Sequence, residues 1–178
     1  MQRADGRALF GSAPRFGGSS VTAPANGVYY LSGDGMPVPM PENDNLDALG
    51  NYLCQVVNQL CVQARLRCRL NVMDLPRDLQ VSSQTRHNIA MAVKEAVHNT
   101  IKHAKAEEVT LRVSLTGRRL TVSVQDDGHG FDTANQPGGS GLKNMQRRLA
   151  DLGGSCSIQS KVGGGTIVEM NLVMKLPE

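Results

Sequence analysis

Three polar side chains at helical spacing and two glycine-rich loops are the parts of this chain best suited to chemistry. Glu95, Asn99 and Lys102 lie in a segment with a helical pattern. At about 100° per residue they fall within roughly 60° of one another on one face. Residues 126–131 and 138–145 form the two loops, the first of them acidic. A carboxylate, a carboxamide and an ammonium followed by such loops fit a site for a nucleotide triphosphate with a divalent metal ion.

The opposite side of the same helix is apolar. It carries Ile89, Val93, Ala96, Val97, Thr100 and Ala104. This amphipathic pattern predicts a helix that packs one side on a core and presents the other to solvent. The helix alone therefore also fits an ordinary surface helix with a solvated face, and it is the loops that favour a nucleotide site.

Glycine-rich loops occur in several kinds of nucleotide site, and the sequence excludes some of them. A P-loop requires Gly-x-x-x-x-Gly-Lys-Ser/Thr, which the chain lacks. A dinucleotide fingerprint requires Gly-x-Gly-x-x-Gly/Ala directly after a strand. The residues that follow Gly130 and Gly141 do not fit that pattern, and the protein-kinase motifs His-Arg-Asp and Asp-Phe-Gly are also missing.

Four motifs, taken in order, carry a closer resemblance. They are Glu-x-x-x-Asn-x-x-Lys-His-Ala from residue 95, Asp-x-Gly-x-Gly-Phe from 126, Gly-x-Gly-Leu-x-Asn-Met from 139 and Gly-x-Gly-Thr from 163. In this order they resemble the Bergerat ATP-binding fold shared by gyrase B, Hsp90, MutL and histidine kinases. The chain is most similar to the ATPase domain of sensor histidine kinases whose helix carries Lys-His-Ala, as in nitrate/nitrite-sensor-type kinases. The resemblance covers about residues 42–175.

At the phosphate end of the nucleotide, the resemblance implies a catalytic set of Glu95, Asn99 and Lys102. Asn99 would offer an amide oxygen to Mg²⁺ between the phosphates. Lys102 would supply positive charge, with His103 assisting. Glu95 would orient a metal-bound water or act as a base, and a role as a hydrogen-bonding neighbour of the site is equally open.

At the base end, Asp126 resembles the aspartate that reads adenine by accepting from its exocyclic amino group. Guanine presents a carbonyl oxygen there, so a penalty of about 1–3 kcal/mol predicts at least ~10-fold preference for ATP. Gly128 and Gly130 would let the backbone approach the base. Thr166 resembles the threonine that reaches the adenine side of the pocket, directly or through water.

The second glycine loop completes the ATP-binding set implied by the resemblance. Gly139, Gly141 and Leu142 lead into a helix whose N-terminal amides would meet phosphate oxygens. Residues 131–140 would form a mobile lid over the nucleotide. His129 occupies a variable position of its motif and is expected to face solvent.

Composition narrows the class of protein. The 178 residues suffice for a domain with an aliphatic core, since 40% are hydrophobic and only 3% aromatic. A net charge of +3 is too small to indicate nucleic-acid binding. No apolar run approaches the roughly 18 residues of a membrane span. Four cysteines without metal-type spacing fit a reducing compartment. We therefore expect a cytoplasmic domain with no direct membrane span, and leave tethering open for a parent protein.

Hydrophobic periodicity predicts the elements that position the motifs. Residues 1–41 lack it and are expected to be disordered or irregular, apart from a short extended piece at 28–31, so the domain is expected over 42–178. Helices are predicted at 46–66, 83–105 and 142–152, and strands at 68–72, 109–115, 120–124, 155–161 and 166–174. Three helices and about five strands predict a two-layer α/β sandwich with a mixed, mostly antiparallel sheet.

The histidines bear on the partners. Kinases of this kind transfer the γ-phosphoryl group of ATP to a histidine, followed by an acidic residue, on a separate helical dimerisation domain. None of His87, His98, His103 and His129 precedes an acidic residue, so the chain resembles the catalytic half alone. The resemblance implies a histidine-bearing dimerisation domain and a response regulator receiver domain as partners. Two alternatives stay open: an anti-sigma-type Ser/Thr protein kinase of the same fold, and a non-catalytic ATP-sensing interaction module.

Overall fold

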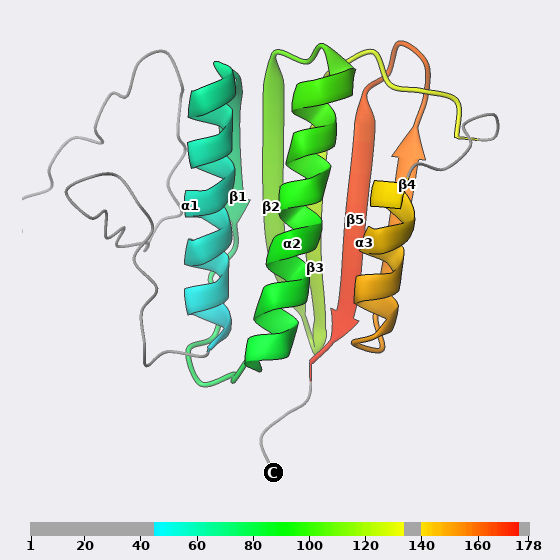
Figure 1. Cartoon of the computed structure of the whole chain (residues 1–178). Coiled ribbons are helices and arrows are strands. Elements are labelled where there is room, and N and C mark those ends of the chain that lie inside the picture. The colour runs from blue at the N-terminus through cyan, green and yellow to red at the C-terminus, as the bar shows by residue number, and fades with distance from the viewer. Residues whose placement is uncertain (1–44, 134–139, 175–178) are drawn as a thin grey trace, which may run out of the picture.

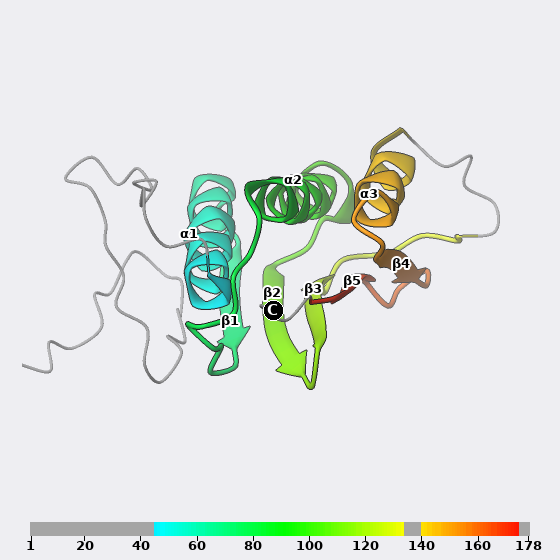
Figure 2. The ribbon, with the colours of Figure 1, turned by 90° about the horizontal axis from the view of Figure 1, so that it is seen from below.

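The computed structural model describes residues 45–133 and 140–174. Three helices lie side by side over one face of a five-stranded sheet (Figure 1). Seen from below, after a 90° turn about the horizontal axis, the helices form one layer and the strands a second (Figure 2). The predicted two-layer α/β sandwich is therefore confirmed. The expectations for residues 1–41, the boundary at 42 and the central part of the lid, 134–139, lie outside the described residues.

Helices α1 (Leu46–Ala64) and α2 (Ser83–Asn99) each begin after a polar capping residue. Asn45 Oδ1 and Ser82 Oγ each accept a hydrogen bond from the backbone N–H three residues on, at 2.9 and 3.1 Å. These bonds satisfy amides that the first turn of a helix leaves free. Helix α1 ends two residues before the predicted boundary, because Arg65 adopts a left-handed conformation with φ 59°.

The helix predicted over 83–105 changes geometry before its end. After Asn99 the chain continues as a π-helical turn, η1 (Thr100–Ala104), which is followed by Lys105 in a left-handed conformation with φ 51°. Such turns are rare and are found mostly as short insertions near functional sites. This one falls in the Asn-x-x-Lys-His-Ala motif, so the irregularity lies where the sequence places the phosphate end of the site.

The sheet has the strand order β1-β2-β3-β5-β4. Its strands are β1 (Arg67–Val72), β2 (Glu108–Thr116), β3 (Arg119–Asp126), β4 (Ser155–Ser160) and β5 (Thr166–Val173). Strand β1 runs parallel to β2, and the other neighbours are antiparallel, as expected for a mixed, mostly antiparallel sheet. Helix α3 (Ser140–Ala150) contacts β4 and β5 and lies two residues earlier in the chain than predicted.

The core lies between the two layers and is aliphatic. Fully buried side chains come from both of them and include Leu49, Leu53, Ile89, Val93, Leu111 and Leu120. Each strand turns alternate residues toward the helices, which explains the period-two pattern of the sequence. No helix in the described part of the chain is long and apolar enough to cross a membrane. Among the described residues, Asp126 is the only charged one that is buried. It is the last residue of β3 and lines a cavity.

Candidate functional site

A cavity of about 370 Å³ opens where the end of α2 meets the loop after β3 and the start of α3. Its lining residues are Ala96, Asn99, Thr100, His103, Ala104, Val124, Asp126, His129, Gly130, Phe131, Gly141, Leu142, Thr166 and Val168. Apolar side chains and glycines form part of this lining and polar side chains converge among them, which is the usual make-up of a small-molecule site. The cavity draws on all four motifs that the sequence singled out.

Asp126 is the buried charge of this cavity. Its Oδ1 accepts from the backbone N–H groups of Gly128 at 3.0 Å and Thr166 at 3.1 Å. Its Oδ2 accepts from the hydroxyl of Thr100 at 3.0 Å. Three donors compensate the burial of a carboxylate that is only 6% exposed. The structure thus places Asp126 in the cavity wall with a fixed orientation.

Thr166 lies next to Asp126 at the start of β5 and lines the same wall. Its hydroxyl is 3.0 Å from Ser160 Oγ. The Ser160 hydroxyl accepts from the N–H of Phe131 at 2.8 Å and donates to the carbonyl of Gly165 at 3.0 Å. Ser160 therefore ties β4 to two of the glycine loops. The sequence offered no signal for this role, because a serine at the end of a strand is commonplace.

The loop after β3 is held by its backbone. The N–H of His129 donates to the carbonyl of Ala104 at 2.9 Å, and the carbonyl of His129 accepts from Gly163 at 2.6 Å. Gly130 has φ 58°, and a Cβ there would collide with the carbonyl oxygen of Lys161. Glycine is required at this position for both its conformation and its size.

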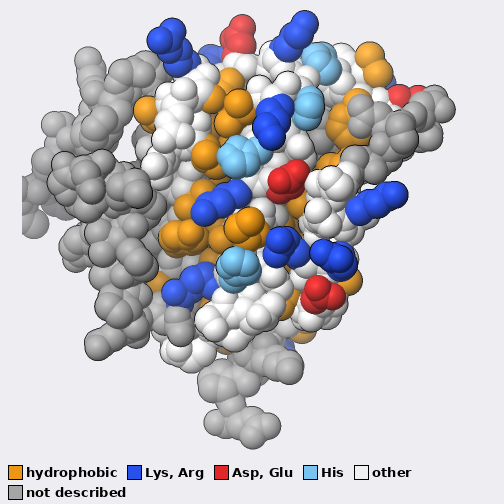
Figure 3. Space-filling model, viewed as in Figure 1, with side chains coloured by type: hydrophobic (Ala, Val, Ile, Leu, Met, Phe, Trp, Pro, Cys, Tyr) orange, Lys and Arg blue, Asp and Glu red, His pale blue; other side chains and the backbone are white. Residues whose placement is uncertain are grey.

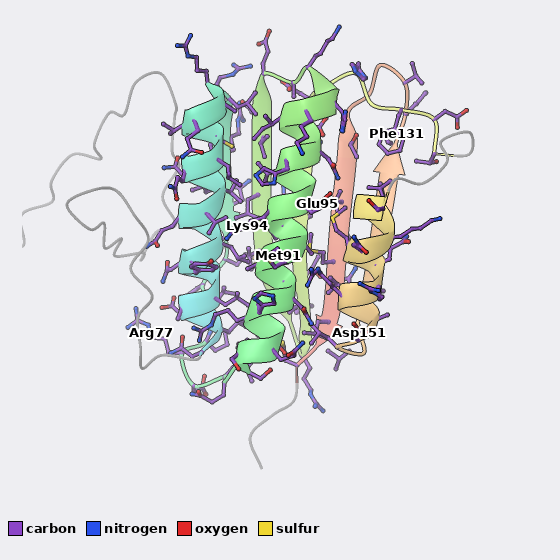
Figure 4. The ribbon with its side chains drawn as sticks, in the orientation of Figure 1. Arg77, Met91, Lys94, Glu95, Phe131 and Asp151 are labelled. Carbon is purple, nitrogen blue, oxygen red and sulfur yellow. The ribbon has the colours of Figure 1, made fainter. Side chains whose placement is uncertain are left out.

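The phosphate-end residues separate into two groups. Asn99 and His103 line the cavity, whereas Glu95 and Lys102 do not, and Lys102 is exposed. The Glu95 carboxylate lies against Gly141 in the first turn of α3, where a Cβ would collide with it. Figure 4 shows Glu95 on α2, the helix next to α3. The structure therefore brings Asn99 to the cavity and sets Glu95 at its rim.

The remaining glycine-loop residues divide similarly. Gly141 and Leu142 line the cavity, Gly128 contributes its N–H to Asp126, and Gly139 lies outside the described residues. His129 is exposed, as expected, and it is also one of the residues that line the cavity.

Half of the lining residues are not among the ligand contacts that the sequence predicted: Ala96, Thr100, Ala104, Val124, His129, Phe131 and Val168. The sequence placed Thr100 only on the apolar side of the helix, and Phe131 only in a motif and the lid.

Asp127, next to Asp126, has a structural role and does not line the cavity. Its Oδ1 accepts from the N–H groups of Glu107 and Glu108 at 2.8 and 2.9 Å, at the start of β2.

The cysteines lie away from the cavity lining. Cys54, Cys61 and Cys68 are buried, and all four cysteines are free thiols. Burial raises the pKa of Cys54 to about 12 and that of Cys156 to about 11. A hydrogen bond with Cys61, together with burial, raises the pKa of Cys68 as well. Such thiols stay protonated at neutral pH and act as small hydrophobic side chains.

Known proteins share this sequence pattern. A sequence model of the family described as "Histidine kinase-, DNA gyrase B-, and HSP90-like ATPase" matches residues 84–176. The nitrate/nitrite sensor protein NarQ of Escherichia coli is 31% identical over 134 residues, which are 74% of this chain and 23% of that protein. The signal transduction histidine-protein kinase/phosphatase DegS of Bacillus subtilis is 30% identical over 103 residues, 56% of this chain and 27% of that protein. The chain thus spans about a quarter of the length of these relatives.

Solved structures share the fold. The histidine kinase domain of the Erythrobacter litoralis blue-light activated histidine kinase superposes with a TM-score of 0.61 at 25% identity, over 71% of this chain and 61% of that one. The Acinetobacter baumannii histidine kinase AdeS gives 0.59 at 16% identity, over 74% of this chain and 66% of that one. The chain therefore belongs to the family of histidine kinase-, DNA gyrase B- and HSP90-like ATPases, and residues 84–176 carry its ATP-binding domain.

Proposed function

We propose that this chain is the catalytic domain of a two-component sensor histidine kinase, extending over residues 42–178. It would hold Mg-ATP and deliver the γ-phosphoryl group to a histidine on a separate dimerisation domain. The observation that carries the proposal is the cavity in which Asp126, Asn99 and His103 meet. The relatives, a nitrate/nitrite sensor protein and a histidine-protein kinase/phosphatase, support a kinase over other members of the family.

At the base end, Asp126 would accept a hydrogen bond from the exocyclic amino group of adenine. The apolar side chains of Val124, Val168 and Leu142 line the same cavity and suit a flat ring. Guanine would instead turn a carbonyl oxygen toward the carboxylate. That mismatch supports a preference for ATP of at least ~10-fold.

At the phosphate end, the side chains fit Mg²⁺ held mainly by the nucleotide. Among the described residues no three His, Cys, Asp or Glu side chains are grouped to hold an ion. Asn99 lines the cavity, and its carboxamide would offer the hard oxygen ligand that Mg²⁺ prefers beside phosphates. When bound, the ion would neutralise charge on the phosphates during transfer.

The charged side chains around Asn99 would complete the reaction site. Lys102, one residue before His103 on the same turn, would offer positive charge to the phosphates, and His103, which lines the cavity, would assist by hydrogen bonding. Glu95, at the rim, would orient a water or accept a proton. Catalysis would then come mainly from positioning and charge neutralisation.

The partners follow from what the described chain presents. Basic side chains predominate over acidic ones on the helical face (Figure 3), which suits an acceptor whose histidine is followed by an acidic residue. A response regulator receiver domain would take the phosphoryl group onward. We place the domain in the cytoplasm, with tethering left to a longer parent protein.

A label-transfer experiment tests this function. The chain is incubated with γ-labelled ATP and Mg²⁺, alone and with a histidine-bearing dimerisation domain from a sensor kinase. We expect acid-labile label on the supplied domain and none after its histidine is replaced by glutamine. Acid-stable label on Ser or Thr of a partner would instead indicate the anti-sigma-type kinase. ATP binding with no transfer of label to any partner would indicate the non-catalytic sensing module.

A further inference from the structure

We propose that Thr100 positions the adenine-reading carboxylate and thereby sets the selectivity of the site for the 6-amino group. This inference rests on the proposed function, in which Asp126 receives that amino group. Thr100 would not need to touch the nucleotide. It would act by deciding which acceptor position of Asp126 is presented to the cavity.

The inference depends on how many acceptor positions of the Asp126 carboxylate are already occupied. An ionised carboxylate offers about four lone-pair positions, two on each oxygen. The N–H groups of Gly128 and Thr166 take both positions on Oδ1. The Thr100 hydroxyl takes one position on Oδ2 at 3.0 Å. Among the described contacts, a single acceptor position on Oδ2 is left for a ligand in the cavity.

The Thr100 hydroxyl has one proton and two acceptors within reach. Its Oγ1 lies 3.0 Å from Asp126 Oδ2 and 3.3 Å from the carbonyl oxygen of Ala96. A bond to a carboxylate is the stronger of the two because the acceptor is charged. The proton is therefore committed to Asp126. Since Thr100 is only 4% exposed, water has little access to replace it.

Thr100 makes this bond with a residue that lies 26 positions later in the chain. Thr100 is the first residue of the π turn η1, at the point where α2 changes geometry. The three donors to Asp126 thus come from three separate parts of the fold: η1, the loop after β3, and β5. Fixing the carboxylate from three directions prepares it for the ligand and lowers the ordering cost of binding.

A merely structural role makes a different prediction. If the Thr100 hydroxyl only stabilises the helix end, its loss weakens binding of every purine nucleotide to the same degree. If it positions Oδ2, its loss weakens selectivity for the amino group specifically. The decisive quantity is therefore a ratio of two affinities, that of ATP over that of purine riboside 5′-triphosphate, which lacks the 6-amino group.

The test compares Thr100→Val, which keeps the shape and removes the hydroxyl, with Thr100→Ser, which keeps the hydroxyl. The matched control is Thr121→Val, because Thr121 makes its hydrogen bond to Asn171 at 2.9 Å within the sheet, away from the cavity lining. Calorimetric titration of the full chain gives both affinities, and thermal denaturation confirms folding. We expect the wild-type chain, Thr100→Ser and Thr121→Val to favour ATP by about 10-fold, and Thr100→Val by less than about 3-fold.

Two binding results distinguish a failure of the adenine-reading role of Asp126 from a failure of the positioning role of Thr100. A wild-type chain that binds both nucleotides equally would overturn the adenine-reading role of Asp126 itself. A wild-type preference that survives unchanged in folded Thr100→Val would overturn the role of Thr100 alone. If Thr100→Val does not fold, Thr100→Ala takes its place, with the same expected loss of the ratio.

Discussion

Replacing Asp126 by Asn keeps the size of the side chain and removes its charge, which isolates the carboxylate from its packing. The N–H groups of Gly128 and Thr166 fix the orientation of the new amide, because its oxygen must accept both of their bonds. The NH₂ group then occupies the position of Oδ2. A donor would face the amino group of adenine, which is also a donor.

The size of the effect follows from that exchange. A hydrogen bond to a charged group contributes about 1.5–3 kcal/mol, so its loss weakens ATP binding by roughly 10- to 150-fold. GTP would present a carbonyl oxygen to the new NH₂ group, so the preference for ATP over GTP is expected to disappear or reverse. Calorimetric titration of both proteins with both nucleotides measures this, and thermal denaturation confirms that the variant is folded. A folded Asp126→Asn that binds ATP within about 3-fold of wild type would refute the reasoning.

Three further outcomes are expected. Asn99→Ala should weaken binding of Mg-ATP about 10-fold more than binding of ATP in EDTA, because only the former uses the amide oxygen; equal losses in the two titrations would contradict a metal-ligand role. Gly130→Ala should lower the melting temperature well beyond Gly117→Ala. Both glycines have φ 58°, a conformation that costs an alanine about 1–2 kcal/mol. A Cβ at Gly117 meets open space, whereas a Cβ at Gly130 would collide with the backbone. Similar melting temperatures would argue against the close approach at Gly130. Burial raises the pKa of Cys54 from 9.0 to about 12, so above pH 9 the unfolded chain releases a proton that the folded chain keeps, and stability is lost as pH rises toward 12. Cys54→Ala should reduce the slope of unfolding free energy against pH above 9, as measured by urea denaturation, and an unchanged slope would assign the alkaline loss to other groups.

Sequence reasoning succeeded where local signals agree with the tertiary structure. Helices α1 and α2 begin at residues 46 and 83, as predicted, and Asn45 and Ser82 cap them there. The hairpin pairs Val109 with Asp126 and Thr116 with Arg119, since alternation on both strands fixes the register. The motifs likewise predicted that Asp126 and Asn99 belong to one site, and the structure lines one cavity with both.

What the sequence did not reveal depends on contacts between distant segments. The bond from Thr100 to Asp126 and the bond from Phe131 to Ser160 each join two elements that only the folded sheet brings together. The π turn η1 begins after Asn99, so it breaks the regular helical period between Asn99 and Lys102. Helical spacing predicted a shared face for Glu95, Asn99 and Lys102, but it did not indicate that Asn99 alone of the three lines the cavity.

The central claim is that the cavity around Asp126 is an adenine nucleotide site, and equilibrium binding tests it most directly. The full chain is titrated calorimetrically with ATP and with GTP in the presence of Mg²⁺. We predict one site per chain with at least ~10-fold preference for ATP. No binding of ATP, or equal binding of ATP and GTP, would contradict the claim.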